Sequence, residues 1–201
     1  MKTKLVTAVL TTIVASAAFA TESPRVGAPA PDFSASDSKG KTRSLSEFKG
    51  KYVVLEWFNP ECPFVKKHYG SGNMQKLQKE AADHGVVWLT IDSSAPGQEG
   101  NLTPDAASKA MTDLKMNSTA LLLDADGKAG QTYGAKNTPH MFVINPAGQL
   151  IYQGAIDDKP TANPADVATA NNYVRAAITD AMANRPVANP TTKPYGCSVK
   201  Y

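Results

Sequence analysis

Cysteine is scarce in this sequence, and blocks of basic residues are missing. Only 2 of its 201 residues are cysteines, which excludes a small domain held together by several disulfides. Lysine and arginine total 21 against 18 acidic residues, and they form no cluster that would neutralise a row of phosphates. Nucleic acid is therefore not an expected partner. Hydrophobic residues make up 42% of the chain, as in an ordinary globular protein.

The chain also lacks an apolar run long enough to span a membrane. Residues 5–19 are almost wholly apolar or small, but a spanning helix needs about 20 apolar residues. Lys2 and Lys4 precede this run, and residues 18–20 (Ala-Phe-Ala) fit a secretory cleavage site. We therefore predict a signal peptide over residues 1–20 and export to the periplasm or the medium, without membrane association after cleavage. The two cysteines would then meet an oxidising compartment.

Strand and helix patterns alternate along the mature chain. Continuous apolar runs rich in strand-forming residues indicate buried strands, and one-sided apolar spacing indicates helices. The expected strands are two short ones within residues 32–45, then 52–58, 86–91 and 119–123, and a hairpin of 141–145 and 149–155. The expected helices are 63–84, 104–116 and 164–184. This order predicts one α/β domain over residues 21–184, with a mixed central sheet, helices on both faces and an extended C-terminal tail over 185–201.

Cys62 stands where the strand 52–58 ends and the next helix begins, with Pro63 at the first helical position. The N-terminal end of a helix favours the thiolate, which is the nucleophilic form of cysteine. The adjacent Glu61 opposes ionisation by its like charge, so the sequence leaves the direction of the net pKa shift open. A buried, inert cysteine is the alternative. The polar, proline-bounded turn favours a reactive one.

Cys197 lies in the tail, 12 residues after Arg185. An extended segment of that length reaches at most about 40 Å, which is enough to fold back over the domain. In that arrangement Cys62 attacks a disulfide or a peroxide, and Cys197 resolves the resulting mixed disulfide or sulfenic acid. The alternative is a permanent Cys62–Cys197 disulfide without turnover, which would stabilise the fold by up to about 4–5 kcal/mol.

Three segments carry a resemblance to a known family. They are NPECPFVKK, TYGAKNTPHMFVINPAGQLIYQG and the ending TTKPYGCSVKY. With the Pro-rich N-terminal segment, they make residues 24–201 similar to the thioredoxin-fold redoxins, specifically the peroxiredoxin-like branch of the alkyl hydroperoxide reductase and thiol-specific antioxidant (AhpC/TSA) family. The resemblance implies a thioredoxin-like three-layer sandwich with an N-terminal β-hairpin extension. It also implies that the Thr138–Pro139 peptide is cis and packs against Cys62.

The sequence departs from the family pattern around Cys62. Thioredoxins carry Cys-x-x-Cys: if Cys62 fills the second cysteine position, Asn59 stands at the first, and if Cys62 fills the first, Val65 stands at the second. No disulfide can form within the motif in either case. Leu55 and Asn59 stand where peroxiredoxins carry proline and threonine, and no arginine lies near Pro139. The set of groups that activates peroxide is therefore incomplete, although the Asn59 amide can still donate a hydrogen bond.

We therefore expect an exported oxidoreductase that exchanges thiols and disulfides or slowly reduces peroxides, with no organic cofactor. Its partners would be protein or small-molecule thiols and disulfides, or peroxides, and a periplasmic reductant of unknown identity. One alternative is a non-catalytic binding module with a structural disulfide. Another is a copper chaperone, because His140 is expected to face Cys62 and, with His68 and Cys197, would make a soft-metal site. The paired cysteines of thioredoxin-fold copper chaperones are missing, so no metal is expected.

Overall fold

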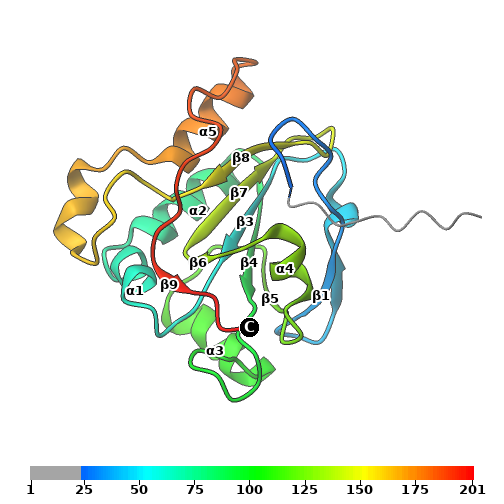
Figure 1. The fold of residues 1–201 in the computed structure, drawn as a ribbon, viewed down its shortest axis with the longest axis vertical. Helices are drawn as coiled ribbons and strands as arrows, with labels where there is room; N and C mark the ends of the chain where they lie inside the picture. Colours follow the sequence, from blue (N-terminus) through cyan, green and yellow to red (C-terminus); the bar gives the residue numbers. More distant parts are fainter. Residues whose placement is uncertain (1–23) are drawn as a thin grey trace, which may run out of the picture.

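A seven-stranded mixed sheet forms the centre of the molecule, which the computed structural model describes over residues 24–201 (Figure 1). The predicted signal peptide lies outside the described residues. In spatial order the strands are β2 (Thr42–Ser44), β1 (Ser34–Asp37), β5 (Ala120–Leu123), β4 (Val87–Asp92), β3 (Val53–Trp57), β7 (His140–Ile144) and β8 (Leu150–Gly154). Strands β3, β4 and β5 are parallel, whereas β7 is antiparallel to β3 and forms a hairpin with β8. The predicted mixed sheet, its N-terminal hairpin and its C-terminal hairpin are confirmed.

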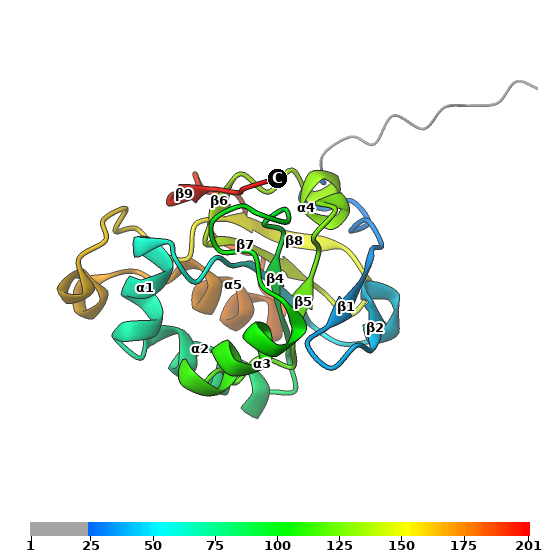
Figure 2. The same cartoon turned by 90° about the horizontal axis from the view of Figure 1, so that it is seen from below.

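Helices cover both faces of the sheet, which confirms the predicted three layers. One face carries α1 (Pro63–Gly70), α2 (Asn73–Asp83), α3 (Pro104–Asp113) and α5 (Tyr173–Met182); the other carries α4 (Lys128–Tyr133) and the 3-10 helix η1 (Leu45–Phe48) (Figure 2). Each face has its own apolar core, because alternate residues of the central strands point to opposite sides. Within residues 24–201, no helix is both long and apolar enough to cross a membrane.

Two of the predicted helices are interrupted. The pattern over 63–84 forms α1 and α2, separated at Gly72, whose φ of 74° is left-handed and cannot continue a right-handed helix. The pattern over 164–184 forms the 3-10 helix η2 (Pro164–Thr169) and then α5, which starts afresh because the Asn172 side chain accepts a hydrogen bond from the Arg175 N–H. Helix α4 and the two-residue strands β6 (Asn137–Thr138) and β9 (Cys197–Ser198) were not predicted.

Strand β3 is buried along its whole length, including the carboxylate of Glu56. This carboxylate accepts hydrogen bonds at 2.8–3.2 Å from four side chains on neighbouring elements, which with Glu56 we call the Glu56 cluster: Tyr69, Gln78, Trp88 and Thr90. Burial disfavours the charged form and raises the pKa of Glu56 to about 7, although the four donors oppose the shift. The Glu56 cluster therefore ties β3 to α1, α2 and β4 just below the turn that carries Cys62.

The C-terminal tail runs back over the sheet, as its extended sequence predicts (Figure 1). It first follows β8, where the Thr192 N–H donates to the Gln153 carbonyl at 3.0 Å. It then forms β9, which pairs antiparallel with β6 so that Cys197 lies opposite Thr138. The last residues are also fixed, because the Tyr201 hydroxyl donates to the Ala135 carbonyl at 2.8 Å. The fold thus brings the tail cysteine to the end of the sheet where β3 meets α1.

Candidate active site

Cys62 is the residue that caps α1, and its position is fixed by the turn before it. The Cys62 N–H donates to the Asn59 carbonyl at 3.2 Å, and the Lys66 N–H donates to the Cys62 carbonyl at 2.9 Å. Pro63 follows at the first helical position, as predicted, where its missing N–H leaves no hydrogen bond unmade. The side chain of Cys62 is only 2% exposed. A strand end, a turn and a helix start therefore hold one sulfur in a single place.

Asn59 organises this turn rather than facing an open site. Its Oδ1 accepts from the Glu61 N–H at 2.8 Å, and its Nδ2 donates to the Glu99 carbonyl at 2.8 Å. Gly100 packs on the same amide so closely that a Cβ at that position would lie 2.2 Å from Asn59 Oδ1. The Asn59 amide was expected to be able to donate a hydrogen bond to a peroxide. In the structure it is already engaged in hydrogen bonds within the protein.

The sulfur of Cys62 contacts two backbone segments that are distant in sequence. Its thiol donates to the Thr138 carbonyl at 3.1 Å, and the Cys197 N–H points at Cys62 Sγ with an N···S distance of 3.4 Å. The Thr138–Pro139 peptide is cis, as the family resemblance implied. The structure therefore brings Cys62, Thr138, Pro139 and Cys197 together, and both thiols are free.

The two thiols have opposite pKa shifts. Burial alone would raise the pKa of Cys62, but hydrogen bonds from the Cys197 thiol and from the Val65 and Cys197 N–H groups outweigh it and lower that pKa. The pKa of Cys197 is raised to about 12, first by burial and then by its hydrogen bond to Cys62 and the proximity of that charge. Cys62 is thus the more acidic of the two thiols. The structure supplies the sign that the sequence left open.

Glu61 does not oppose this ionisation at close range. Its carboxylate pairs with Lys66 Nζ at 2.8 Å, and both side chains are more than half exposed to solvent. Solvent and the lysine therefore screen the charge that the sequence analysis weighed against a thiolate.

The two histidines considered as metal ligands are not brought to Cys62. His140 stacks on Phe142, with ring centroids 4.5 Å apart, in the core on the other face of the sheet. The expectation that His140 faces Cys62 is therefore wrong. His140 lies opposite Trp57 in the sheet and two residues before Phe142, so it shares their face, whereas Cys62 belongs to the core on the face that carries α1. His68 is buried under α1 and contacts Tyr195 instead. Within residues 24–201 no group of three or more His, Cys, Asp or Glu side chains is arranged to hold a metal ion.

Gly196 lets the tail approach the site closely. A Cβ at this position would lie 2.1 Å from the Thr138 carbonyl oxygen, and its φ of 127° is rarely adopted by other residues. The glycine before Cys197 is therefore a requirement of β9 lying directly on β6.

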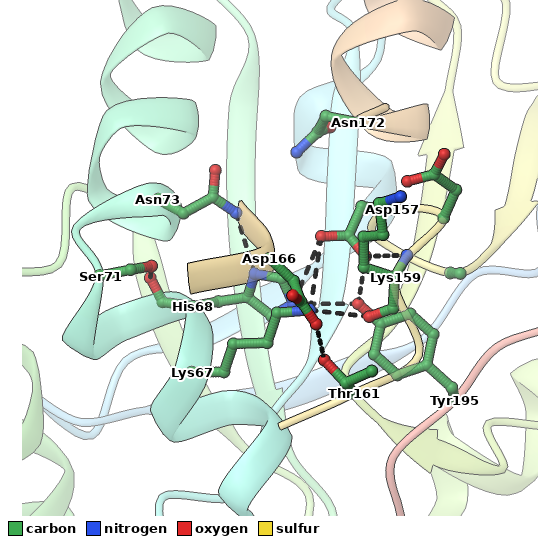
Figure 3. Close-up of polar contacts among 12 residues, drawn as sticks. Lys67, His68, Ser71, Asn73, Asp157, Lys159, Thr161, Asp166, Asn172 and Tyr195 are labelled. Carbon is green, nitrogen blue, oxygen red and sulfur yellow. Dashed lines mark hydrogen bonds and ion pairs between the residues drawn. The ribbon is translucent and has the colours of Figure 1, made fainter. Parts of the chain in front are cut away.

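A second buried polar group lies beside the cysteines and was missed by the sequence analysis. We call it the Asp157 cluster; it consists of Lys67 and His68 on α1, Asp157 after β8, and Tyr195 on the tail (Figure 3). The side chains of Lys67, His68 and Asp157 are at most 1% exposed. Helical spacing alone gives no signal for a buried lysine, because the residues that bury Lys67 lie about 90 and more positions later in the chain.

Comparisons with known proteins give relatives named as thiol-disulfide oxidoreductases and as peroxiredoxins. A sequence model of the family described as AhpC/TSA matches residues 26–153. The chain is 28% identical over 135 residues to "Thiol-disulfide oxidoreductase ResA" of Bacillus thuringiensis subsp. konkukian, covering 66% of this chain and 70% of that protein. It is 28% identical over 164 residues to "Peroxiredoxin-2" of Macaca fascicularis, covering 72% of this chain and 75% of that protein.

A solved structure matches over a longer stretch. The crystal structure of an uncharacterized conserved protein from Geobacillus kaustophilus superposes with a TM-score of 0.76 at 25% identity, covering 88% of this chain and 92% of that one. This superposition extends well beyond the 128 residues from 26 to 153 that the family model matches.

Proposed function

Because this chain belongs to the AhpC/TSA family, we propose that it is a thiol-dependent oxidoreductase in which Cys62 is the nucleophile and Cys197 the resolving cysteine. One observation carries the proposal: the tail brings Cys197 to Cys62, whose pKa is lowered. The backbone nitrogen of Cys197 lies 3.4 Å from Cys62 Sγ. A thiolate next to a protonated thiol is the arrangement that a dithiol needs before it reduces a disulfide.

The reaction is written as two exchanges. The Cys62 thiolate attacks a substrate disulfide, forming a Cys62–substrate disulfide and releasing one substrate thiolate, which takes up a proton. Cys197 then loses its proton and attacks Cys62 Sγ, forming the Cys62–Cys197 disulfide and releasing the second substrate thiol. The substrate gains two electrons from the two sulfurs and two protons, one from Cys197 and one from solvent, which received the Cys62 proton when that thiol ionised. An external thiol reductant returns the protein to its dithiol state.

Disulfides fit this site better than peroxides. The Asn59 amide is committed to the turn. Three arginines form ion pairs elsewhere and are not available to hold a peroxide oxygen: Arg43 with Asp37 and Glu47, Arg175 with Glu80, and Arg185 with Asp180. Any sulfenic acid formed on Cys62 would still meet the Cys197 thiol. We therefore propose thiol–disulfide exchange as the main activity, with peroxide reduction as a slow side reaction.

The test uses the reduced full-length mature protein and oxidised glutathione. We expect the wild type to release two glutathione thiols and to form a Cys62–Cys197 disulfide, detected by mass spectrometry after alkylation. The variant Cys197→Ser should stop at a glutathione adduct on Cys62, and Cys62→Ser should not react. Equal reactivity of the three proteins would overturn the assignment of roles.

The two alternative functions are outcomes of related measurements. A Cys62–Cys197 disulfide with a reduction potential below about −300 mV would identify a structural bridge instead of a catalytic one. Stoichiometric Cu(I) binding that is lost in Cys62→Ser would favour metal delivery.

We also propose that the protein is exported, with cleavage after Ala20. The basic start, short apolar run and small-residue site support it, and an oxidising compartment would supply disulfide substrates. N-terminal sequencing of the protein from a bacterial periplasmic fraction should begin at Thr21. Recovery of the uncleaved chain in the cytosol would contradict export.

A further inference from the structure

We propose that the Asp157 cluster holds the tail closed over Cys62, and that Tyr195 is the positioning residue whose buried hydroxyl makes this closure favourable. This inference deepens the proposed function, since the segment that carries Cys197 must also move aside before a bulky substrate reaches Cys62. Tyr195 is two residues before Cys197, and only Gly196 lies between them.

A directed chain of hydrogen bonds connects the helix of the nucleophile to the tail. The Asn73 amide nitrogen, which can only donate, lies 2.9 Å from His68 Nδ1. Burial lowers the pKa of His68 to about 4, so the ring is neutral at physiological pH and carries its single proton on Nε2. His68 Nε2 therefore donates to the Tyr195 hydroxyl at 3.2 Å, which leaves that hydroxyl to donate to Asp157 Oδ1 (Figure 3).

The ion pair in this cluster is incomplete without the tail. Lys67 Nζ lies 3.8 Å from Asp157 Oδ2 and donates its one short hydrogen bond to the Lys159 carbonyl at 2.7 Å. Asp157 Oδ2 is buried without a hydrogen bond. Among the residues that the structure describes, Asp157 Oδ1 accepts only from the Lys159 N–H and from Tyr195. Burying a carboxylate with so few hydrogen-bond donors costs free energy. Removal of the Tyr195 hydroxyl would take away one of the two hydrogen bonds that Asp157 accepts.

The tyrosine ring adds apolar contacts to the same docking. It lies 5.7 Å from the Phe64 ring, which is two residues after Cys62, and Lys67 Nζ is 5.5 Å from its centroid. Three residues of α1 thus contact one residue of the tail. The tail backbone is held as well: Thr192 donates to β8, β9 pairs with β6, and the Lys200 carbonyl accepts from the Ala95 N–H at 2.7 Å. Tyr195 adds side-chain contacts with α1 to this backbone pairing, immediately before the segment that covers the sulfur.

The test measures how readily Cys62 is exposed. In a Cys197→Ser background Cys62 is the single thiol, and its alkylation by iodoacetamide is followed by mass spectrometry across a range of pH. The midpoint of the profile reports the pKa of Cys62, and the plateau reports how often the tail opens. We expect Tyr195→Phe to raise the plateau about tenfold, which corresponds to about 1.4 kcal/mol. The midpoint should move little.

Tyr52→Phe is the matched control. Its hydroxyl also donates a hydrogen bond, in this case to the Ala181 backbone carbonyl at 3.1 Å, but Tyr52 lies outside the tail and the Asp157 cluster. This variant should leave the plateau unchanged. A plateau for Tyr195→Phe that equals the parent, or that rises equally in Tyr52→Phe, would overturn the proposal.

A double-mutant cycle tests whether Tyr195 acts through Asp157. In an Asp157→Asn background, Tyr195→Phe should raise the plateau by less than about threefold, because the charged acceptor is already gone. Fully additive effects would show that the hydroxyl acts elsewhere. If Asp157→Asn alone fails to fold because Lys67 is left unpaired, the neutral pair Asp157→Asn with Lys67→Met is the background. The alkylation result stands apart from disulfide formation, so failure of Cys197 to resolve would end the proposed function without deciding this one.

Discussion

Two buried carboxylates, Glu56 and Asp157, solve the same problem in different ways. Glu56 is surrounded by four side-chain donors from α1, α2 and β4, and no cation within residues 24–201 is paired with it. Asp157 has two hydrogen bonds, one unpartnered oxygen and a lysine at 3.8 Å. The first cluster is completed by residues of the domain itself. The second is completed by the tail.

This difference explains why one cluster is structural and the other can respond to the tail. A fully hydrogen-bonded group gains nothing from an additional partner, so the Glu56 cluster fixes β3 and its turn permanently. A group short of donors gains more from each partner that arrives. Docking of the tail is therefore coupled to the charge state and geometry of the Asp157 cluster, and it is not coupled to the Glu56 cluster.

The largest effect should come from removing the cation beside Asp157. Lys67→Met leaves a fully buried carboxylate without its counter-ion, and we expect a loss of about 3–5 kcal/mol in the free energy of unfolding. Urea denaturation measures it. Adding Asp157→Asn to this variant should recover most of the loss, whereas a single variant as stable as the wild type would show that no ion pair exists.

Ionisation of Glu56 as the pH rises should lower the free energy of unfolding by a similar or smaller amount. Its pKa is about 7 in the folded chain against 4.5 as the ordinary value. The native state therefore binds the proton more tightly than the unfolded state. The contribution of Glu56 to the free energy of unfolding is fully present below pH 4.5 and falls by about 3 kcal/mol as the pH rises to 7. Glu56→Gln should remove this component from the pH dependence of urea unfolding; an unchanged profile would contradict it.

Displacing the tail backbone should have a smaller effect. It should weaken the docking of the tail, which completes the Asp157 cluster, and leave the Glu56 cluster unchanged. Gly196→Ala places a Cβ against the Thr138 carbonyl in an unfavourable conformation, which costs about 1–3 kcal/mol of docking. We expect oxidised glutathione to form the Cys62–Cys197 disulfide at least about tenfold more slowly. Gly148→Ala is the control, since Gly148 also has a positive φ but an open environment. Equal rates in both variants would argue against the close approach.

The smallest expected effect distinguishes the contribution of the thiol contact to tail docking from that of the Asp157 cluster. Cys197→Ala removes the thiol that donates to Cys62, so the pKa of Cys62 should rise, as followed by the ultraviolet absorbance of the thiolate. Tyr195 and its partners are untouched, so Cys62 should remain shielded from iodoacetamide at pH values where it is ionised. Rapid alkylation would mean that the thiol contact, rather than Tyr195, holds the tail.

Local patterns predicted most of the fold. The central strand, the helix start at Pro63 and the C-terminal hairpin all follow from residues that are neighbours in sequence. The break at Gly72 and the 3-10 helix η2 were missed because apolar spacing continued through both. Strands β6 and β9 were missed because each has only two residues, and 59 positions separate Thr138 from Cys197 at the closest pair.

The sequence by itself determined an α/β domain, a cysteine between a buried strand and a helix, and a tail long enough to return to that cysteine. Only the tertiary structure decided the direction of the Cys62 pKa shift, the orientation of His140 and the burial of Lys67. Each of these depends on desolvation and hydrogen bonds from groups far along the chain, such as the Cys197 N–H, which is 135 residues from the sulfur it contacts. Periodicity reports which face of an element is buried, and long-range contacts decide what lies against that face.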